Sequence, residues 1–207
     1  AEEETSAAVV IKNLRAGVRQ LFETPILRSL FSVQVLVLTS FGLSNTLLLP
    51  FALRALNATE FEYGLQEGLT SIGFVVGSLL MANIIDRMRE GAWLAMSFFG
   101  MAAVGIIYST LHSIPLAIMM IAFSGFFNAP SSIARRLIVQ RNTPREMRGR
   151  VSSVFFVARD IFFLIGMSAA GLADLMDVRL LYLVSALMLF FAGLVVRTGP
   201  GRRGLEV

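Results

Sequence analysis

The chain of 207 residues is 56% hydrophobic and only 15% charged, with a mean hydropathy of +0.73 and a formal net charge of +4. A soluble domain averages roughly 25% charged residues and has no interior large enough for this much apolar surface, so a soluble fold is excluded. Cysteine is absent and His112 is the single histidine, which excludes disulfides, thiolate metal sites and histidine-based nucleophilic catalysis. We therefore expect neither an enzyme nor a metal site.

The first segment, residues 1–25, predicts a cytoplasmic amphipathic linker that lies on the membrane surface. Apolar residues recur at helical spacing between Val10 and Phe22, basic residues occupy the opposite face, and Pro25 ends the pattern. Such a helix is too polar to span a bilayer but suits its surface. A soluble linker helix has the same periodicity and stays open as an alternative.

Both ends of the chain bear on its origin. It begins Ala1-Glu2-Glu3-Glu4 without an initiator methionine or a signal peptide, so we expect a segment from the middle of a longer protein. The cytoplasmic tail, residues 199–207, closes with Leu205-Glu206-Val207, which fits the remnant of a protease-tag linker. The tail is left out of the fold prediction.

Six hydrophobic runs define a six-helix transmembrane unit over residues 26–198. About 20 helical residues, at about 1.5 Å each, cross roughly 30 Å of hydrocarbon. Because lipid offers the backbone no hydrogen-bond partners, each run is predicted to be a helix, and the fold class is all-α integral membrane. The predicted spans are 26–53, 63–85, 92–111, 114–133, 151–172 and 180–196.

Polar residues mark one face of the first and fourth spans. The first span carries Gln34 and Asn45, and the fourth carries Ser124, Asn128 and Ser131 at spacings of four and three residues. Residues spaced in this way share a helix face. These five side chains are the candidate residues of a substrate cavity.

Small residues mark the second span. Gly73 and Gly77 form a GxxxG row, and small residues let helix backbones approach closely. Tight packing against another helix is predicted, either within this chain or at an interface with another protein segment.

The fifth span contains an adjacent charged pair, Arg159-Asp160. A charge near the bilayer centre costs roughly 2.5 to 3.5 kcal/mol. Neighbouring residues on a helix diverge by about 100°, so we expect each of the two to find a partner elsewhere. A purely structural pairing and a role in proton coupling both stay open, because burial can shift the pKa of a carboxylate into a useful range. Both residues are candidate coupling residues.

The distribution of cations predicts the orientation. Fifteen of the eighteen Lys and Arg residues lie on one side of the predicted spans, only Arg54 and Arg179 lie on the other, and Arg159 lies within the membrane. By the positive-inside rule both ends of the segment are cytoplasmic, in a multi-pass protein of the cell (inner) membrane. Clustered arginines also attract nucleic acid, but the apolar runs that flank residues 135–150 argue against such a partner.

A short internal match suggests a repeat. Residues 82–88 align with residues 170–176 at an offset of 88, at the ends of the second and fifth spans. Two copies of three spans with opposite orientation form a 3+3 inverted repeat, an architecture of many transporters.

Two motifs resemble the major facilitator superfamily. Asp86-Arg87 resembles the core of its G-x-x-x-D-R-x-G-R-R/K loop signature, from which Asn83, Arg89 and Glu90 depart. The segment from Gln140 to Val151, with Pro144 and Arg148-Gly149-Arg150, resembles the Q-x-x-x-P-x-x-x-R-G-R-V segment of drug-efflux and siderophore-export branches. The Arg159-Asp160 pair is a further departure from the pattern of the family.

The resemblance implies the C-terminal half of a twelve-helix secondary transporter, whose partners are the N-terminal half, the bilayer and a small-molecule substrate. The first and fourth helices would line the cavity, and a gating loop would include Asp86, Arg87, Arg148 and Arg150. The expected function is export of a small amphiphilic compound by alternating access, coupled to a proton or other ion gradient and needing no cofactor. Alternatives are a lipid-translocating member of the superfamily and a self-assembling six-span scaffold or channel subunit.

Overall fold

The structure is a computed structural model that describes residues 7–84 and 89–198. Asp86 and Arg87 of the predicted gating loop, and the tail at 199–207, lie outside the described residues. Over the described residues the chain is helical and contains no strand. The long helices are α1 (Ala7–Glu23), α2 (Pro25–Pro50), α3 (Glu60–Ile84), α4 (Glu90–Thr110), α5 (Ile114–Arg141), α6 (Arg148–Ala169) and α7 (Val178–Thr198).

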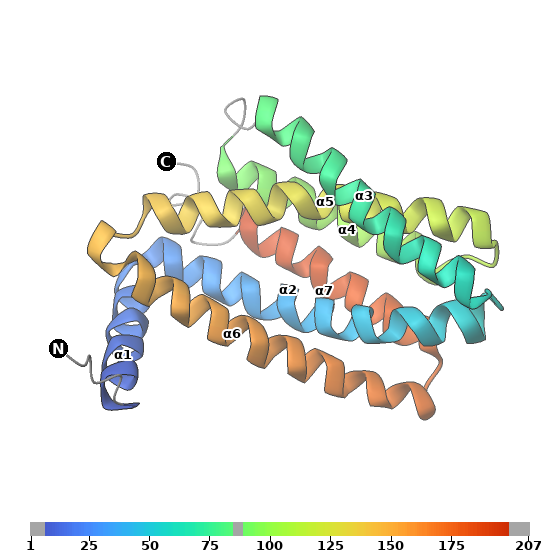
Figure 1. The fold of residues 1–207 in the computed structure, drawn as a ribbon, viewed down its shortest axis with the longest axis horizontal. Coiled ribbons are helices and arrows are strands. Elements are labelled where there is room, and N and C mark those ends of the chain that lie inside the picture. Colours follow the sequence, from blue (N-terminus) through green and yellow to red (C-terminus); the bar gives the residue numbers. More distant parts are fainter. Residues whose placement is uncertain (1–6, 85–88, 199–207) are drawn as a thin grey trace.

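Six of these helices form a bundle, and α1 lies across one end of it (Figure 1). All six are long and apolar enough to cross a membrane, which confirms the prediction of an all-α membrane protein. Short turns extend or join them: the π-helical turn η1 (Phe51–Ala55) continues α2, and the 3-10 turns η3 (Arg145–Met147) and η4 (Ala170–Asp174) lie before and after α6.

Helix α5 continues well past its hydrophobic run. The run ends at residue 133, but the helix ends at Arg141, where the N–H of Asn142 still bonds to the carbonyl of Ile138. Arginine is a good helix former, so the polar end of the run extends the helix rather than starting a loop. Arg135 and Arg136 consequently project from a helix.

The packing pairs follow a simple rule. Helix α2 packs on α6 and α7, α5 packs on α3 and α4, and α4 packs on α7. Exchanging α2 with α5, α3 with α6 and α4 with α7 leaves this set of pairs unchanged. The bundle therefore has the 3+3 inverted repeat that was predicted.

Reciprocal glycines form the crossing of α2 with α6. A Cβ on Gly42 would overlap the carbonyl oxygen of Phe163, and a Cβ on Gly166 would overlap that of Thr39. In each case the carbonyl belongs to the residue three positions before the facing glycine. Only glycine permits the two backbones to approach this closely.

The crossing of α3 with α5 repeats this geometry. A Cβ on Gly73 would overlap the carbonyl oxygen of Ala122, and a Cβ on Gly125 would overlap that of Thr70. Both carbonyls again lie three residues before the facing glycine, and Gly77 packs on α5 one turn further along. The predicted tight packing of the glycine row is confirmed, and its partner is a helix of the same chain.

The glycines also correct the predicted register of the repeat. Gly42 and Gly125 are 83 residues apart and Gly73 and Gly166 are 93 apart, so a single offset of 88 does not relate the two copies. The second copy is longer between its glycines because α5 and α6 extend further beyond them than α2 and α3 do. Residues 85–88 of the short match at 82–88 and 170–176 lie outside the described residues, and its offset of 88 differs from the offset of 93 between the glycines of α3 and α6.

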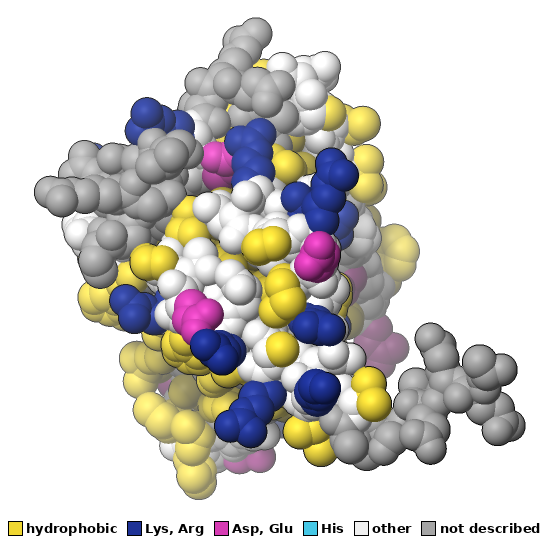
Figure 2. Space-filling model, turned by 90° about the vertical axis from the view of Figure 1, so that its left-hand side faces the viewer, with side chains coloured by type: hydrophobic (Ala, Val, Ile, Leu, Met, Phe, Trp, Pro, Cys, Tyr) yellow, Lys and Arg dark blue, Asp and Glu magenta, His cyan; other side chains and the backbone are white. Residues whose placement is uncertain are grey.

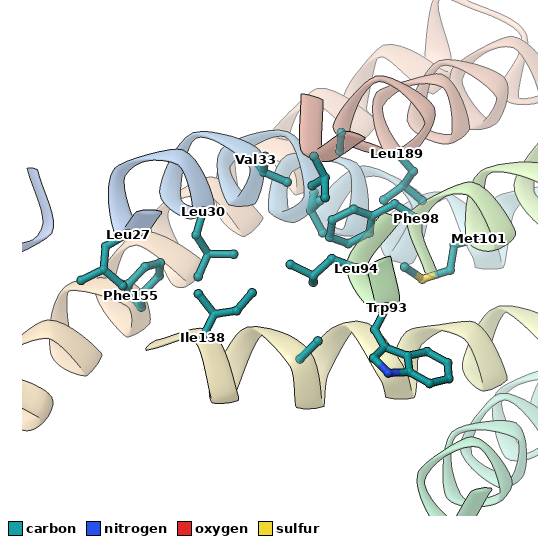
Figure 3. Close-up of a cluster of buried hydrophobic side chains, with 14 of the residues drawn as sticks. Leu27, Leu30, Val33, Trp93, Leu94, Phe98, Met101, Ile138, Phe155 and Leu189 are labelled. Carbon is teal, nitrogen blue, oxygen red and sulfur yellow. The ribbon is translucent and has the colours of Figure 1, made fainter. Parts of the chain in front are cut away.

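Two hydrophobic clusters hold the bundle together. At the end near α1, Leu30 of α2, Leu94 of α4 and Ile138 of α5 point toward a common centre (Figure 3). At the other end, the rings of Phe51, Tyr108 and Tyr182 stack, with centroids 4.7 Å apart for Phe51 and Tyr108 and 4.9 Å apart for the two tyrosines. Because lipid is as apolar as these side chains, the clusters stabilise the bundle through close van der Waals packing rather than through removal from water.

Helix α1 is attached to the bundle rather than free. Its Leu21 is fully buried, and Gly17 lies so close to α6 that a Cβ would meet the carbonyl of Arg150. Val10, Ile11 and Phe22 remain exposed on the helix. The predicted helix is confirmed, and its crosswise orientation suits a membrane surface, where its location stays a prediction.

Candidate functional site

A cavity of about 520 Å³ opens between α2, α5 and α6, near the end of α5 and the start of α6. Its polar lining consists of side chains from all three helices: Gln34, Arg135, Arg136, Gln140, Arg148 and Arg159. The rest of the lining is small or apolar: Ser132, Val139, Ser152, Phe155 and Phe156. The volume is within the roughly 300–1,000 Å³ typical of small-molecule sites.

The cavity exists because α5 and α6 belong to different crossings. Helix α6 is held to α2 by Gly42 and Gly166, whereas α5 is held to α3 by Gly73 and Gly125. The two helices make few contacts with each other, and the cavity occupies the space between them.

The lining is cationic. It contains four guanidinium groups and no carboxylate. Arg148 Nε donates to the carbonyl of Thr143 at 3.2 Å, and Arg159 Nε donates to Asp160 Oδ1 at 2.9 Å. Among the described residues, Arg135 and Arg136 have no hydrogen-bond or ion-pair partner. Like charges this close repel one another, so the empty cavity has an unfavourable electrostatic energy.

Gln34 supplies an unpaired amide to the same cavity. Its side chain is 7% exposed, and Oε1 is buried without a hydrogen-bond partner among the described residues. A buried polar group without a partner costs about 1–3 kcal/mol. No hydrogen bond among the described residues fixes the amide, so a flip of its terminal group exchanges the places of its N–H groups and its carbonyl oxygen.

The structure brings together only some of the predicted site residues. Gln34, Arg148 and Arg159 line the cavity, whereas Asn45 is exposed elsewhere on α2. The other three candidates on the fourth span, Ser124, Asn128 and Ser131, do not line it either. The Ser131 hydroxyl donates to the carbonyl of Asn128 at 2.8 Å and is satisfied within its own helix.

The expectation that Arg159 and Asp160 need separate partners was wrong. They form an ion pair with each other at 2.9 Å, with side chains 52% and 63% exposed. The 100° divergence applies to the Cα–Cβ directions, and the long arginine side chain spans it along the helix surface. The guanidinium also lies 5.4 Å from the ring centroid of Phe156.

Sequence reasoning missed Arg135 and Arg136 as cavity residues and assigned them to a loop. A periodic signal was present on both helices. The cavity residues of α5 stand at positions 132, 135, 136, 139 and 140, and those of α6 at 148, 152, 155, 156 and 159. Both sets follow the spacing of a single helix face.

Basic side chains gather at one end of the bundle, where α1 lies and where α5 ends and α6 begins (Figure 2). The exposed Arg145 and Arg150 belong to this end, and Arg141 forms an ion pair there with Glu90 at the start of α4. Arg54 and Arg179 lie at the opposite end. The asymmetry read from the sequence is therefore an asymmetry of the folded bundle.

The sequence-family model of the Major Facilitator Superfamily matches residues 30–204 of the chain. The chain belongs to this superfamily. It is 25% identical over 200 residues to the multidrug efflux pump Tap of Mycolicibacterium fortuitum, an alignment that covers 96% of this chain and 48% of Tap. It is 24% identical over 146 residues to the enterobactin exporter EntS of Shigella flexneri, covering 70% of this chain and 33% of EntS.

Membership confirms the resemblance drawn from the two motifs and identifies a transporter family rather than an enzyme family. Both relatives are named for efflux or export. The chain spans about half the length of Tap and about a third of that of EntS.

Proposed function

We propose that the chain is the C-terminal six-helix half of a major facilitator transporter that exports a small amphiphilic compound by alternating access. The observation that carries the proposal is the cavity: it lies between the first and fourth helices of the bundle, α2 and α5, and the fifth, α6. Transporters built from inverted repeats place their sites at such repeat interfaces. The names of the relatives favour export.

A second half fits the exposed faces of α3 and α6. Both helices are mostly unburied, and each packs chiefly on one partner within the chain. Large apolar side chains are exposed along both, including Ile72 and Leu79 on α3 and Ile161 and Leu164 on α6. The N-terminal half would cover part of this surface, and lipid the rest.

The basic end of the bundle is proposed to be cytoplasmic, in the inner membrane, with both ends of the segment on that side. Because the chain has no cysteine, labelling of single introduced cysteines gives a clean test. With a membrane-impermeant maleimide, H112C should react in intact cells, and R145C only after permeabilisation. The reverse pattern would contradict this orientation.

We further propose that Asp160 and Arg159 couple transport to the proton gradient. Their ion pair is exposed on α6, so access of water and contacts of a second half would both bear on it. Protonation of Asp160 would break the pair, and burial or exposure of the carboxylate would change its proton affinity. Transport and protonation would then be linked through one side chain.

Asp160→Asn in the full-length transporter tests this coupling. The variant should lose proton-driven accumulation in vesicles while it retains substrate binding. Asp174→Asn is the matched control, since Asp174 pairs with Arg54 at 3.5 Å in an exposed turn at the end of the bundle. Accumulation with the wild-type pH dependence in Asp160→Asn would make Asp160 structural.

The predicted gating loop is proposed to control the rate of the transition between access states. Arg148 and Arg150 stand at the start of α6, next to the contact between α6 and α1. Asp86→Asn or Arg87→Gln should change the transport rate and leave the equilibrium affinity for substrate within a few-fold. A large loss of affinity at an unchanged maximal rate would contradict the gating role.

A further inference from the structure

The guanidinium groups of the cavity have free donor capacity. Each arginine carries five N–H donors, and the forked terminal nitrogens suit bidentate contact with an oxyanion. The bonds of Arg148 and Arg159 use only Nε. Within the described part of the chain, the terminal nitrogens of the four lining arginines donate to no carboxylate, since Asp160 pairs with Nε of Arg159.

The buried amide of Gln34 is an independent sign of a ligand. It is more than nine-tenths buried, borders the cavity and has an unpaired carbonyl oxygen. Buried polar side chains are normally hydrogen-bonded, and an unpaired one requires an explanation. A ligand hydroxyl could donate to this oxygen, and the N–H groups of the same amide could donate to an oxyanion.

The remaining wall is apolar and aromatic. Phe155, Phe156 and Val139 line the cavity together with the arginines, and Phe155 is largely buried. A small inorganic anion would leave this wall and most of the volume of about 520 Å³ unfilled. The lining as a whole fits a molecule with an acidic group at one end and a ring or short chain at the other.

From these observations we infer that the cavity binds the oxyanionic group of an acidic amphiphile, held by Arg135, Arg136, Arg148 and Arg159 and oriented by Gln34. This inference rests on the proposed transport function and specifies its substrate class. The bound group neutralises the mutual repulsion of the arginines. It also bridges α5 to α6, and so joins the two helix pairs that the glycine crossings hold separately.

Two kinds of molecule could supply the acidic group: an aromatic or aliphatic carboxylate that is transported as cargo, and an anionic lipid with its phosphate. The cavity volume and the partly buried aromatic wall favour cargo. Binding is therefore tested with a soluble acid, and a lipid is tested separately.

Equilibrium binding to the full-length transporter in phosphatidylcholine nanodiscs tests the inference, with 1-naphthoate as the probe and its neutral amide as the matched ligand. Naphthoate should bind at least tenfold more tightly than the amide and raise the melting temperature of the protein. Arg135→Gln and Arg136→Gln should each weaken naphthoate binding about tenfold or more. Gln34→Glu, which adds a negative charge, should abolish it.

Arg145→Gln is the control variant, because Arg145 lies at the same basic end of the bundle but outside the cavity. It should retain the wild-type affinity for naphthoate. An equal loss in Arg145→Gln, or equal affinities for naphthoate and its amide, would overturn the inference. Wild-type affinity in a well-folded Arg135→Gln, Arg136→Gln double variant would overturn it as well.

Adding phosphatidylglycerol to the nanodiscs separates the two sources. If the lipid leaves the affinity for naphthoate unchanged, the ligand of the cavity is transported cargo. If the lipid competes with naphthoate, and this competition is lost in Arg135→Gln, the assignment to cargo is overturned. Transport is measured independently. If the transporter exports neutral or cationic compounds and Arg135→Gln does not affect this export, the proposed function stands and the inference about the substrate class is refuted. If naphthoate binds as expected but no compound is transported, the inference about binding stands and the proposed function is refuted.

Discussion

The two glycine crossings are alike at their contact and different around it. In both, each glycine faces the carbonyl three residues before its partner glycine. Yet seven and six residues before its glycine, α6 carries the exposed ion pair Arg159–Asp160, whereas α3 carries Gln66 and Glu67 at the equivalent places, and Glu67 forms no ion pair among the described residues. The crossing depends on the absence of a side chain at a few positions. The outward faces are therefore free to differ, and among the described residues only α6 carries an ion pair at this place.

The helices that surround the two glycine crossings also differ. Helix α2 is enclosed by α6, α7 and α1, whereas α3 packs almost entirely on α5. An enclosed helix cannot move away from an added side chain, but a peripheral helix can. The same substitution is therefore expected to have different consequences at the two crossings.

Gly42→Ala should produce the largest effect, a destabilisation of about 1–3 kcal/mol, because its Cβ overlaps a backbone carbonyl and α2 cannot shift. Gly73→Ala should cost less, since α3 can move outward. Unfolding in mixed micelles measures both. Gly68→Ala is the control: nothing lies within 4 Å of its Cβ position, so the better helix propensity of alanine should leave stability unchanged or raised by up to about 1 kcal/mol. Equal effects at all three positions would refute the difference.

Removal of the Arg179 side chain should produce an effect of similar size. Its guanidinium donates to the carbonyls of Ser109, Leu111 and Ala55 at 3.0, 2.6 and 3.0 Å, and it lies 5.2 Å from the ring centroid of Phe51. Arg179→Ala removes bonds that tie the start of α7 to the ends of α4 and η1, at a cost of about 1.5–3 kcal/mol. Lysine keeps the charge but not the fork, so Arg179→Lys should rescue stability only in part.

The contact that corresponds to Arg179 at the basic end is the ion pair of Glu90 with Arg141, which ties the start of α4 to the end of α5. The Arg141 side chain is 61% exposed, so the pair should contribute no more than about 1 kcal/mol. Arg141→Ala should therefore lower the melting temperature less than Arg179→Ala. The opposite order would mean that the basic end, rather than the aromatic end, limits stability.

Tyr108→Phe should have a small effect that is confined to the α3 side. Its hydroxyl donates to Gln66 Oε1 at 2.7 Å, and Gln66 is fully buried, with no partner for Nε2 among the described residues. The bond should contribute about 1 kcal/mol. A double-mutant cycle with Gln66→Leu measures it, and a coupling energy near zero would show that packing alone holds α3 to α4 at this point.

Sequence reasoning worked best where one helix could be read alone. Hydropathy predicted the six spans, and the glycine row predicted a tight crossing, because both depend on the solvent or backbone next to a single helix. It failed at Arg159 and Asp160, where the reach of a flexible side chain outweighed the helical angle. It also failed at Arg135 and Arg136, whose helical spacing was hidden by their position beyond the apolar run.

By itself, the sequence determined the six membrane spans, which end of the bundle is basic and that the glycine face of the second span packs on another helix. These properties follow from the composition of each segment, because whether a segment spans the membrane and on which side its charges stay depends on its own residues and not on contacts with other segments. Only the tertiary structure decided that Gln34 of α2 borders the same cavity as arginines about a hundred residues away on α5 and α6. That cavity depends on how far two helices diverge, and the divergence is set by crossings with other helices, α2 with α6 and α3 with α5.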